Sequence, residues 1–94
     1  MKSDLDKHIE KHLEDKEFKI YFDRVDAKRK IAQEIVVLRN IHHLTQTELA
    51  RKIGTKQQVI SRLENPTDKR LPSLVFLDKI AHAFEKKLVI SLQG

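Results

Sequence analysis

Apolar side chains recur at intervals of three and four residues through the middle of the chain. From Ile31 to Leu38 this spacing gathers the apolar positions on one face of a helix. We expect this helix to begin near Asp26 and to end near residues 40–43. The same spacing returns further along the chain and predicts three more amphipathic helices: 46–53, 56–64 and a helix that opens at Pro72-Ser73.

The turns between these helices carry their own signals. Thr45 and Glu48 have the spacing of a capping box, in which a hydroxyl and a carboxylate each accept a hydrogen bond from a backbone N–H group at a helix start. Gly54 can adopt the left-handed conformation that ends this helix, and Thr55 is predicted to cap the next one. Two short helices joined by such a turn describe a helix-turn-helix.

The helix expected at 56–64 has an outer face with candidate chemistry. Ile60 and Leu63 would anchor it to the core, and the small side chain of Ala50 would let the preceding helix cross it closely. A surface selected for solubility would carry more Glu and Lys. Glutamine can bind adenine, and arginine guanine, through paired hydrogen bonds. The outward side chains are therefore candidates for contacts with base edges: Lys56, Gln57, Gln58, Ser61 and Arg62.

The two ends of the chain have different patterns. Residues 4–16 carry a narrow apolar stripe, which predicts a loosely held helix, and residues 18–22 hold most of the aromatic side chains. This aromatic cluster could pack on the chain's own core or on a partner, and the sequence favours neither. Residues 87–92 alternate as a strand does. Because no second strand is evident, we expect this strand to pair with a symmetry mate or with another protein.

Charge divides the chain into two parts. Among 94 residues, 19 are basic and 14 acidic, which gives a net charge of +5. Residues 1–26 contain six basic and eight acidic side chains, whereas residues 27–94 contain thirteen and six. A basic body favours a polyanionic partner such as nucleic acid, although a solvated basic surface is the alternative. Together with the helix-turn-helix pattern, this division predicts an N-terminal extension over 1–26 and a DNA-binding domain over 27–94.

Composition argues against several other classes of protein. The chain has no cysteine, and hence no disulfide or thiol chemistry. No apolar run approaches the roughly 20 residues that span a membrane, and the charged N-terminus is unlike a secretory signal, so a cytoplasmic protein is expected. His8 and His12 lie one helical turn apart but lack further ligands. Without a glycine-rich phosphate loop or a nucleophile arrangement, we predict no enzyme, no cofactor and no metal site.

The stretch from Leu44 to Asn65 resembles the helix-turn-helix of the Cro and phage-repressor family, also called the XRE family. The resemblance extends from about Lys28 to Phe84. It implies an all-α fold, a lambda-repressor-like bundle of about five helices whose 56–64 helix enters the major groove of DNA. To this bundle the sequence adds an N-terminal helical extension and a short C-terminal strand.

The resemblance also implies roles for single residues. Gln46, at the start of a helix, would hold a phosphate. Arg39 and Glu64 would form a buried ion pair, and His43 would take a left-handed position where relatives have glycine. The remaining implied roles fall into two groups: Lys56, Gln57, Gln58 and Arg62 would face base edges, and Lys69 and Arg70 would contact the DNA backbone.

Both ends of the chain are similar to HigA-like antitoxins, of the host-inhibition-of-growth type. The similarity lies in residues 13–18 with Tyr21 and in the strand at 87–92. It implies a repressor that also neutralises a small basic toxin that cleaves messenger RNA, with Phe18, Tyr21 and Phe22 contacting the partner. We expect such a repressor to bind double-stranded DNA as a homodimer on a near-palindromic operator. A free-standing regulator, whose leader only adds core, is the alternative.

Overall fold

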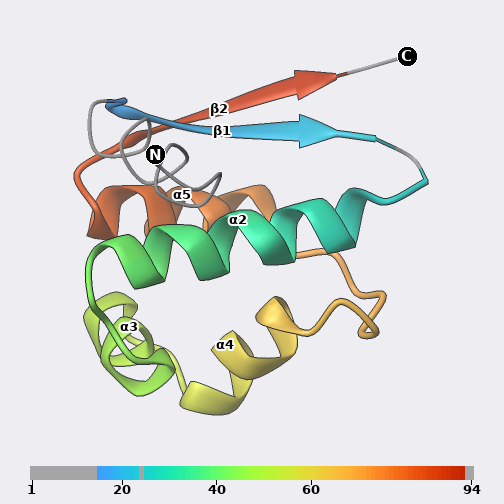
Figure 1. Cartoon of the computed structure of the whole chain (residues 1–94). Helices are drawn as coiled ribbons and strands as arrows, with labels where there is room; N and C mark the ends of the chain where they lie inside the picture. Colours follow the sequence, from blue (N-terminus) through green and yellow to red (C-terminus); the bar gives the residue numbers. More distant parts are fainter. Residues whose placement is uncertain (1–14, 24, 93–94) are drawn as a thin grey trace, which may run out of the picture.

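The longest helix, α2 (Ala27–Ile41), runs through the middle of the molecule and separates a small sheet from two short helices (Figure 1). The computed structural model describes residues 15–23 and 25–92. On one side of α2 lie the two strands, β1 (Glu17–Phe22) and β2 (Lys87–Leu92), and on the other lie α3 (Gln46–Ile53) and α4 (Gln57–Glu64). The last helix, α5 (Leu74–Ala83), contacts β2 and α3.

The two strands form a parallel sheet and pair along their whole length, from Glu17 opposite Lys87 to Phe22 opposite Leu92. Parallel neighbouring strands require a long connection. Here the connection contains all four described helices, which follow β1 and precede β2 in the sequence. The expectation that the strand at 87–92 pairs outside its own chain is therefore wrong. Its partner is the aromatic segment, which alternates between buried Phe18 and Ile20 and exposed neighbours.

The core collects apolar side chains from every described element. The most deeply buried members come from β1 and from all four helices: Phe18, Ile20, Ile35, Leu38, Leu49, Ile60 and Ile80. Because β1 contributes two of them, residues 17–22 pack in the same core as the predicted DNA-binding domain, and the boundary expected after residue 26 falls between two elements of one packed unit.

Most helix predictions are confirmed, including the end of α2 and the opening of α5 at Ser73, whose hydroxyl accepts a bond from the backbone N–H of Phe76. One cap was wrong: the N-cap of α4 is Lys56, and the N–H of Thr55 instead bonds the carbonyl of Ala50. His43 has φ 55°, the left-handed value implied by the resemblance.

The observed fold class differs from the all-α fold that the sequence predicts. The described residues hold four helices and a two-stranded sheet, so this part of the chain is mostly helical with a small β component. Five helices are not found there, and 17–22 is a strand within the segment expected to be helical. The helix expected at 4–16 falls outside the described residues, apart from 15 and 16, which are not helical. None of the helices in the described part is long and apolar enough to cross a membrane.

Candidate nucleic-acid interface

The helix-turn-helix is formed by α3 and α4. At its start, the hydroxyl of Thr45 accepts a bond from the backbone N–H of Glu48 (3.1 Å), and the carboxylate of Glu48 accepts one from the N–H of Thr45 (2.9 Å), which confirms the capping box. Gly54 ends α3 with φ 75°, and an added Cβ there would meet no atom within 4 Å. Glycine is thus favoured at this position by its backbone conformation rather than by crowding.

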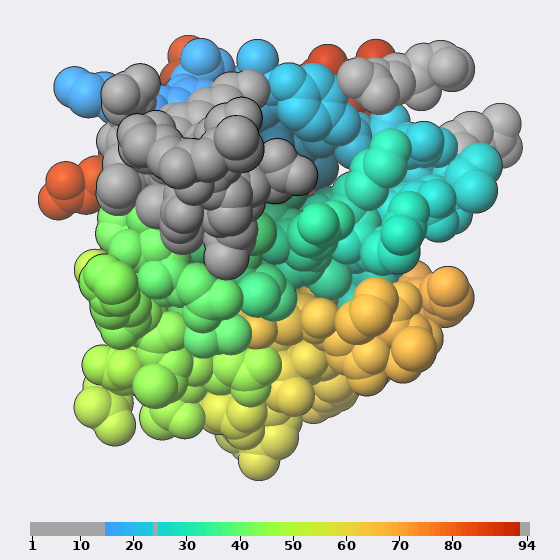
Figure 2. All heavy atoms as spheres, viewed as in Figure 1, coloured from blue at the N-terminus to red at the C-terminus, as the bar shows by residue number. Residues whose placement is uncertain are grey.

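The outer face of α4 is open to solvent. Ile60 and Leu63 are buried and anchor the helix, as expected, and Ala50 of α3 is buried close to it. Figure 2 shows the atoms of α4 and of the following loop (yellow and orange) forming one continuous surface. Most of the side chains predicted to meet base edges are exposed, and one is half-buried: Lys56, Gln58, Ser61 and Arg62 are exposed, and Gln57 is half-buried.

Gln57 is half-buried because a chain of hydrogen bonds holds it. Its amide nitrogen Nε2 donates to Oε1 of Gln46 (2.7 Å), and Nε2 of Gln46 donates to Oε1 of Glu64 (3.0 Å). Glu64 is clamped in turn by Arg39, whose Nε donates to Oε2 (2.7 Å) and whose Nη2 donates to Oε1 (2.9 Å). Four polar side chains from α2, α3 and α4 are therefore joined in series.

The Arg39–Glu64 end of this series is buried. Only 15% of the Arg39 side chain and 5% of the Glu64 side chain are exposed, which confirms the ion pair implied by the resemblance. The bonds from Glu64 raise the pKa of Arg39 above its ordinary value. A buried ion pair is stable only when its hydrogen bonds are well aligned, and here two bonds from Arg39 hold the Glu64 carboxylate in one orientation. Gln46 therefore donates to an acceptor whose position is fixed. The connection from Glu64 through Gln46 to Gln57 was missed by sequence reasoning, since nothing in the local pattern signals it.

A comparison with family models supports the geometric assignment. The model described as helix-turn-helix matches residues 37–90, more than half of the chain. The chain belongs to the XRE-type helix-turn-helix family. It is thereby a DNA-binding transcriptional regulator by family. Comparisons with curated proteins and with solved structures gave no match.

The XRE protein carries further cations in the loop that follows α4. Lys69 and Arg70, which the resemblance assigns to the DNA backbone, are both exposed. Asp68 fixes Arg70: its Oδ2 lies 2.6 Å from Nη2 and its Oδ1 lies 3.1 Å from Nε. These bonds lower the pKa of the Asp68 carboxyl well below its ordinary value. Arg70 remains 70% exposed, so it keeps donors available to another molecule.

A groove of about 290 Å³ lies between α4, this loop and the start of α5. Arg62 and Arg70 both border it, with apolar side chains beneath them such as Val59 and Phe76. The structure therefore brings Arg62 of α4 and Arg70 of the loop to one surface. The eight predicted DNA-contacting residues all lie on α3, on α4 or its N-cap, or in the loop after α4.

The three residues predicted to bind a protein partner differ in how far they are exposed to solvent. Phe18 is 1% exposed and belongs to the core, so the prediction that it contacts a partner needs correction: the chain's own helices cover it. Tyr21 is 43% exposed, and Phe22 is half-buried. His8 and His12, the histidines considered as metal ligands, lie outside the described residues.

Proposed function

We propose that this chain is a homodimeric repressor that reads a near-palindromic operator with α4. Two copies would place their α4 helices in successive major grooves, about 34 Å apart on one face of the duplex. The observation that carries the proposal is the exposed face of α4, on which Gln57 is held by its bond to Gln46 while Arg62 stays free to reach DNA.

The held Gln57 amide retains the groups that adenine requires. Its Nε2 uses one hydrogen for Gln46 and has a second for adenine N7, while its Oε1 can accept from adenine N6. A side chain that is already oriented loses less conformational entropy on binding. Gln46, Lys69 and Arg70 would add phosphate contacts, which fix the position of α4 without reading sequence.

Base reading is tested with Arg62→Ala in gel-shift titrations on the promoter of the chain's own gene and on scrambled DNA. Loss of a bidentate contact should weaken operator binding by about 1–3 kcal/mol and leave binding to scrambled DNA nearly unchanged. Lys87→Ala is the charge-matched control, because Lys87 lies on the sheet, across α2 from α4. An equal loss on both DNAs would make Arg62 a phosphate contact and contradict base reading.

A second step of the proposal is that the repressor is also an antitoxin for a small basic toxin. Exposed apolar side chains near the C-terminal ends of both strands support a protein partner at this end of the sheet. Tyr21 is 43% exposed on β1 and Leu92 is 79% exposed on β2, and because Leu92 pairs with Phe22 the two side chains lie on opposite faces of the sheet. The burial of Phe18 and Ile20 favours the alternative, a free-standing regulator whose leader completes its own core.

Co-expression with the product of the neighbouring gene, followed by size-exclusion chromatography, separates these two functions. Deleting the leader is unsuitable because it removes β1 from the core, so the variant is Tyr21→Ser with Leu92→Ser. We expect this variant to lose the complex and keep DNA binding. Val75→Ser is the control, because Val75 is 68% exposed but lies on α5. A complex that survives the double substitution would place the interface elsewhere, and a neighbouring gene that encodes no small basic protein would favour the free-standing regulator.

A further inference from the structure

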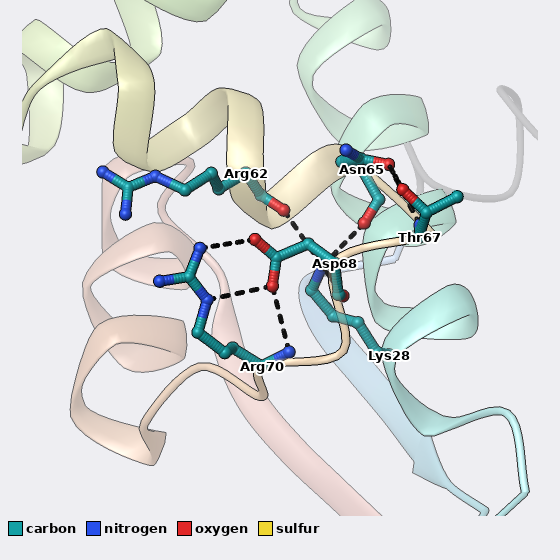
Figure 3. A network of polar contacts seen from close by, with 6 residues as sticks. All are labelled: Lys28, Arg62, Asn65, Thr67, Asp68 and Arg70. Carbon is teal, nitrogen blue, oxygen red and sulfur yellow. Dashed lines mark hydrogen bonds and ion pairs between the residues drawn. The ribbon is translucent and has the colours of Figure 1, made fainter.

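Lys28 stands at the start of α2, yet its ammonium group lies at the far end of the helix-turn-helix. The side chain is buried, with the whole residue 6% exposed. Its Nζ donates to the backbone carbonyls of Arg62 (3.0 Å), Asn65 (2.9 Å) and Asp68 (2.9 Å). Figure 3 shows these acceptors arranged around the lysine. They lie 34 to 40 residues further along the chain.

The three acceptors match the chemistry of the lysine. An ammonium group has three N–H donors and no acceptor, and each donor here has one carbonyl. Arg62 belongs to the last turn of α4 and Asn65 is its C-cap. Their carbonyls each accept one backbone N–H, from Asn65 and from Asp68, and each has a second lone pair for the lysine. A cation at a helix C-terminus is also favoured by the helix dipole. Lys28 therefore joins the end of α4 to the loop that follows it.

The same loop is organised by side-chain bonds on its outer side. Oδ1 of Asn65 accepts from the N–H (3.0 Å) and the hydroxyl (2.8 Å) of Thr67. Asp68 is held at both ends, since its carbonyl accepts from Lys28 and its carboxylate accepts from the backbone N–H of Arg70 (3.0 Å) and from the Arg70 guanidinium. Figure 3 shows a continuous series of contacts from Lys28 through Asp68 to Arg70.

We propose that Lys28 is a positioning residue for DNA binding, which fixes the backbone of Asp68 so that its carboxylate presents Arg70 beside Arg62. The inference rests on the proposed function, in which Arg70 contacts the DNA backbone. It goes beyond that function because Lys28 itself touches no DNA. Between α4 and α5 no described residue has regular secondary structure, so the geometry of this loop depends on contacts of this kind.

The first experiment compares Lys28→Met with Lys86→Met in operator binding over a range of salt concentrations. Methionine keeps an unbranched side chain, one heavy atom shorter than that of lysine, and removes all three donors. Lys86 is matched because it is also buried, at 8% exposure, and bonds a backbone carbonyl, that of Asp15, beside the sheet. We expect Lys28→Met to bind about tenfold more weakly and with a salt slope shallower by about one, as for a lost phosphate contact. Lys86→Met should keep both the affinity and the slope.

A double-mutant cycle then asks whether Lys28 acts through Arg70. We expect Arg70→Ala to weaken binding severalfold in the wild-type chain and to have little further effect in Lys28→Met, since residues that act as a unit are not additive. Equal losses in the two backgrounds, or an unchanged salt slope in Lys28→Met, would overturn the inference. If Lys28→Met lowers the folded fraction, Lys28→Gln, whose amide retains two N–H donors, is used in the same cycle.

Failure of the inference and failure of the proposed function give different results. If the wild-type chain binds its promoter no better than scrambled DNA, the proposed function fails and the inference falls with it. If the wild type binds specifically but Lys28 and Arg70 contribute independently, only the positioning role is wrong.

Discussion

The sheet side and the helix-turn-helix side of this molecule are held by different sets of interactions. On the sheet side, β1 buries Phe18 and Ile20 and pairs by its backbone with β2 along its whole length. On the other side, α3 and α4 also bury two side chains each, and polar bonds from α2 reach the backbone at the end of α4 and the buried carboxylate of Glu64. Buried apolar side chains therefore anchor both sides, whereas hydrogen bonds from α2 additionally orient polar groups at the helix-turn-helix. Stability and recognition should therefore respond to different substitutions.

The largest effect should come from Phe18→Ala on the sheet side. Phe18 is 1% exposed in the core, and truncating a buried phenylalanine costs about 3–5 kcal/mol because it removes apolar burial and leaves a cavity. For a small domain this is a large fraction of the free energy of unfolding. Denaturant unfolding should show the loss, while operator affinity, corrected for the folded fraction, should change little.

Tyr21→Ala is the matched control on the same strand. Because Tyr21 is 43% exposed, its truncation should cost much less than that of Phe18. If the two substitutions cost the same, or if Phe18→Ala weakens DNA binding by the folded protein, the separation between the two sides would not hold.

The next effect, smaller but still large, concerns the buried ion pair on the helix-turn-helix side. Glu64→Gln removes the charge that compensates Arg39, and removing one partner of such a pair costs about 3 kcal/mol. Unlike Phe18→Ala, it should also weaken operator binding by the folded protein, because Gln46 loses its charged acceptor and holds Gln57 less firmly. Denaturant unfolding and operator titration together test this difference.

Replacing both partners by methionine sharpens the test. Arg39→Met with Glu64→Met should cost less stability than Glu64→Gln alone, because no unpaired charge remains buried. It should still impair operator binding, since Gln46 again lacks its acceptor. Restored binding in the double variant would show that the Glu64–Gln46–Gln57 series does not orient the recognition surface.

The same contrast explains how much the sequence could predict. The predictions for α3 that depend on neighbouring residues are confirmed. The Thr45–Glu48 capping box and the turn at Gly54 each depend on residues that are only a few positions apart in the sequence. The Arg39–Glu64 pair, 25 residues apart, was reached only through the family resemblance. The N-cap of α4 was missed by one residue, because Lys56 makes no side-chain capping bond that a pattern could signal.

Long-range features could not be predicted from local patterns. The strand at 17–22 is recognisable only with its partner at 87–92, and a two-stranded sheet depends on packing against the helices as well as on pairing. Lys28 is one of many basic residues in the sequence. Lys28 is distinguished by its hydrogen bonds to three backbone carbonyls. Every residue has a backbone carbonyl, so the sequence does not show which carbonyls will accept these bonds.

The smallest expected effect lies at His42, where the end of α2 meets the end of α5. Its ring centroid is 4.6 Å from that of Phe84. Burial, with further contributions from Lys86, Lys52 and His43, lowers the pKa of His42 below its ordinary value of 6.5. As the pH falls through 6.5, the unfolded chain therefore binds this proton before the folded chain does, and the free energy of unfolding decreases. Denaturant unfolding between about pH 7.5 and about pH 5 should show a steeper loss for the wild type than for His42→Gln. Because His42 lies at the C-cap of α2 and not on α4, operator affinity should follow the same pH dependence in both proteins. Parallel stability curves of the wild type and His42→Gln would contradict a lowered pKa of His42.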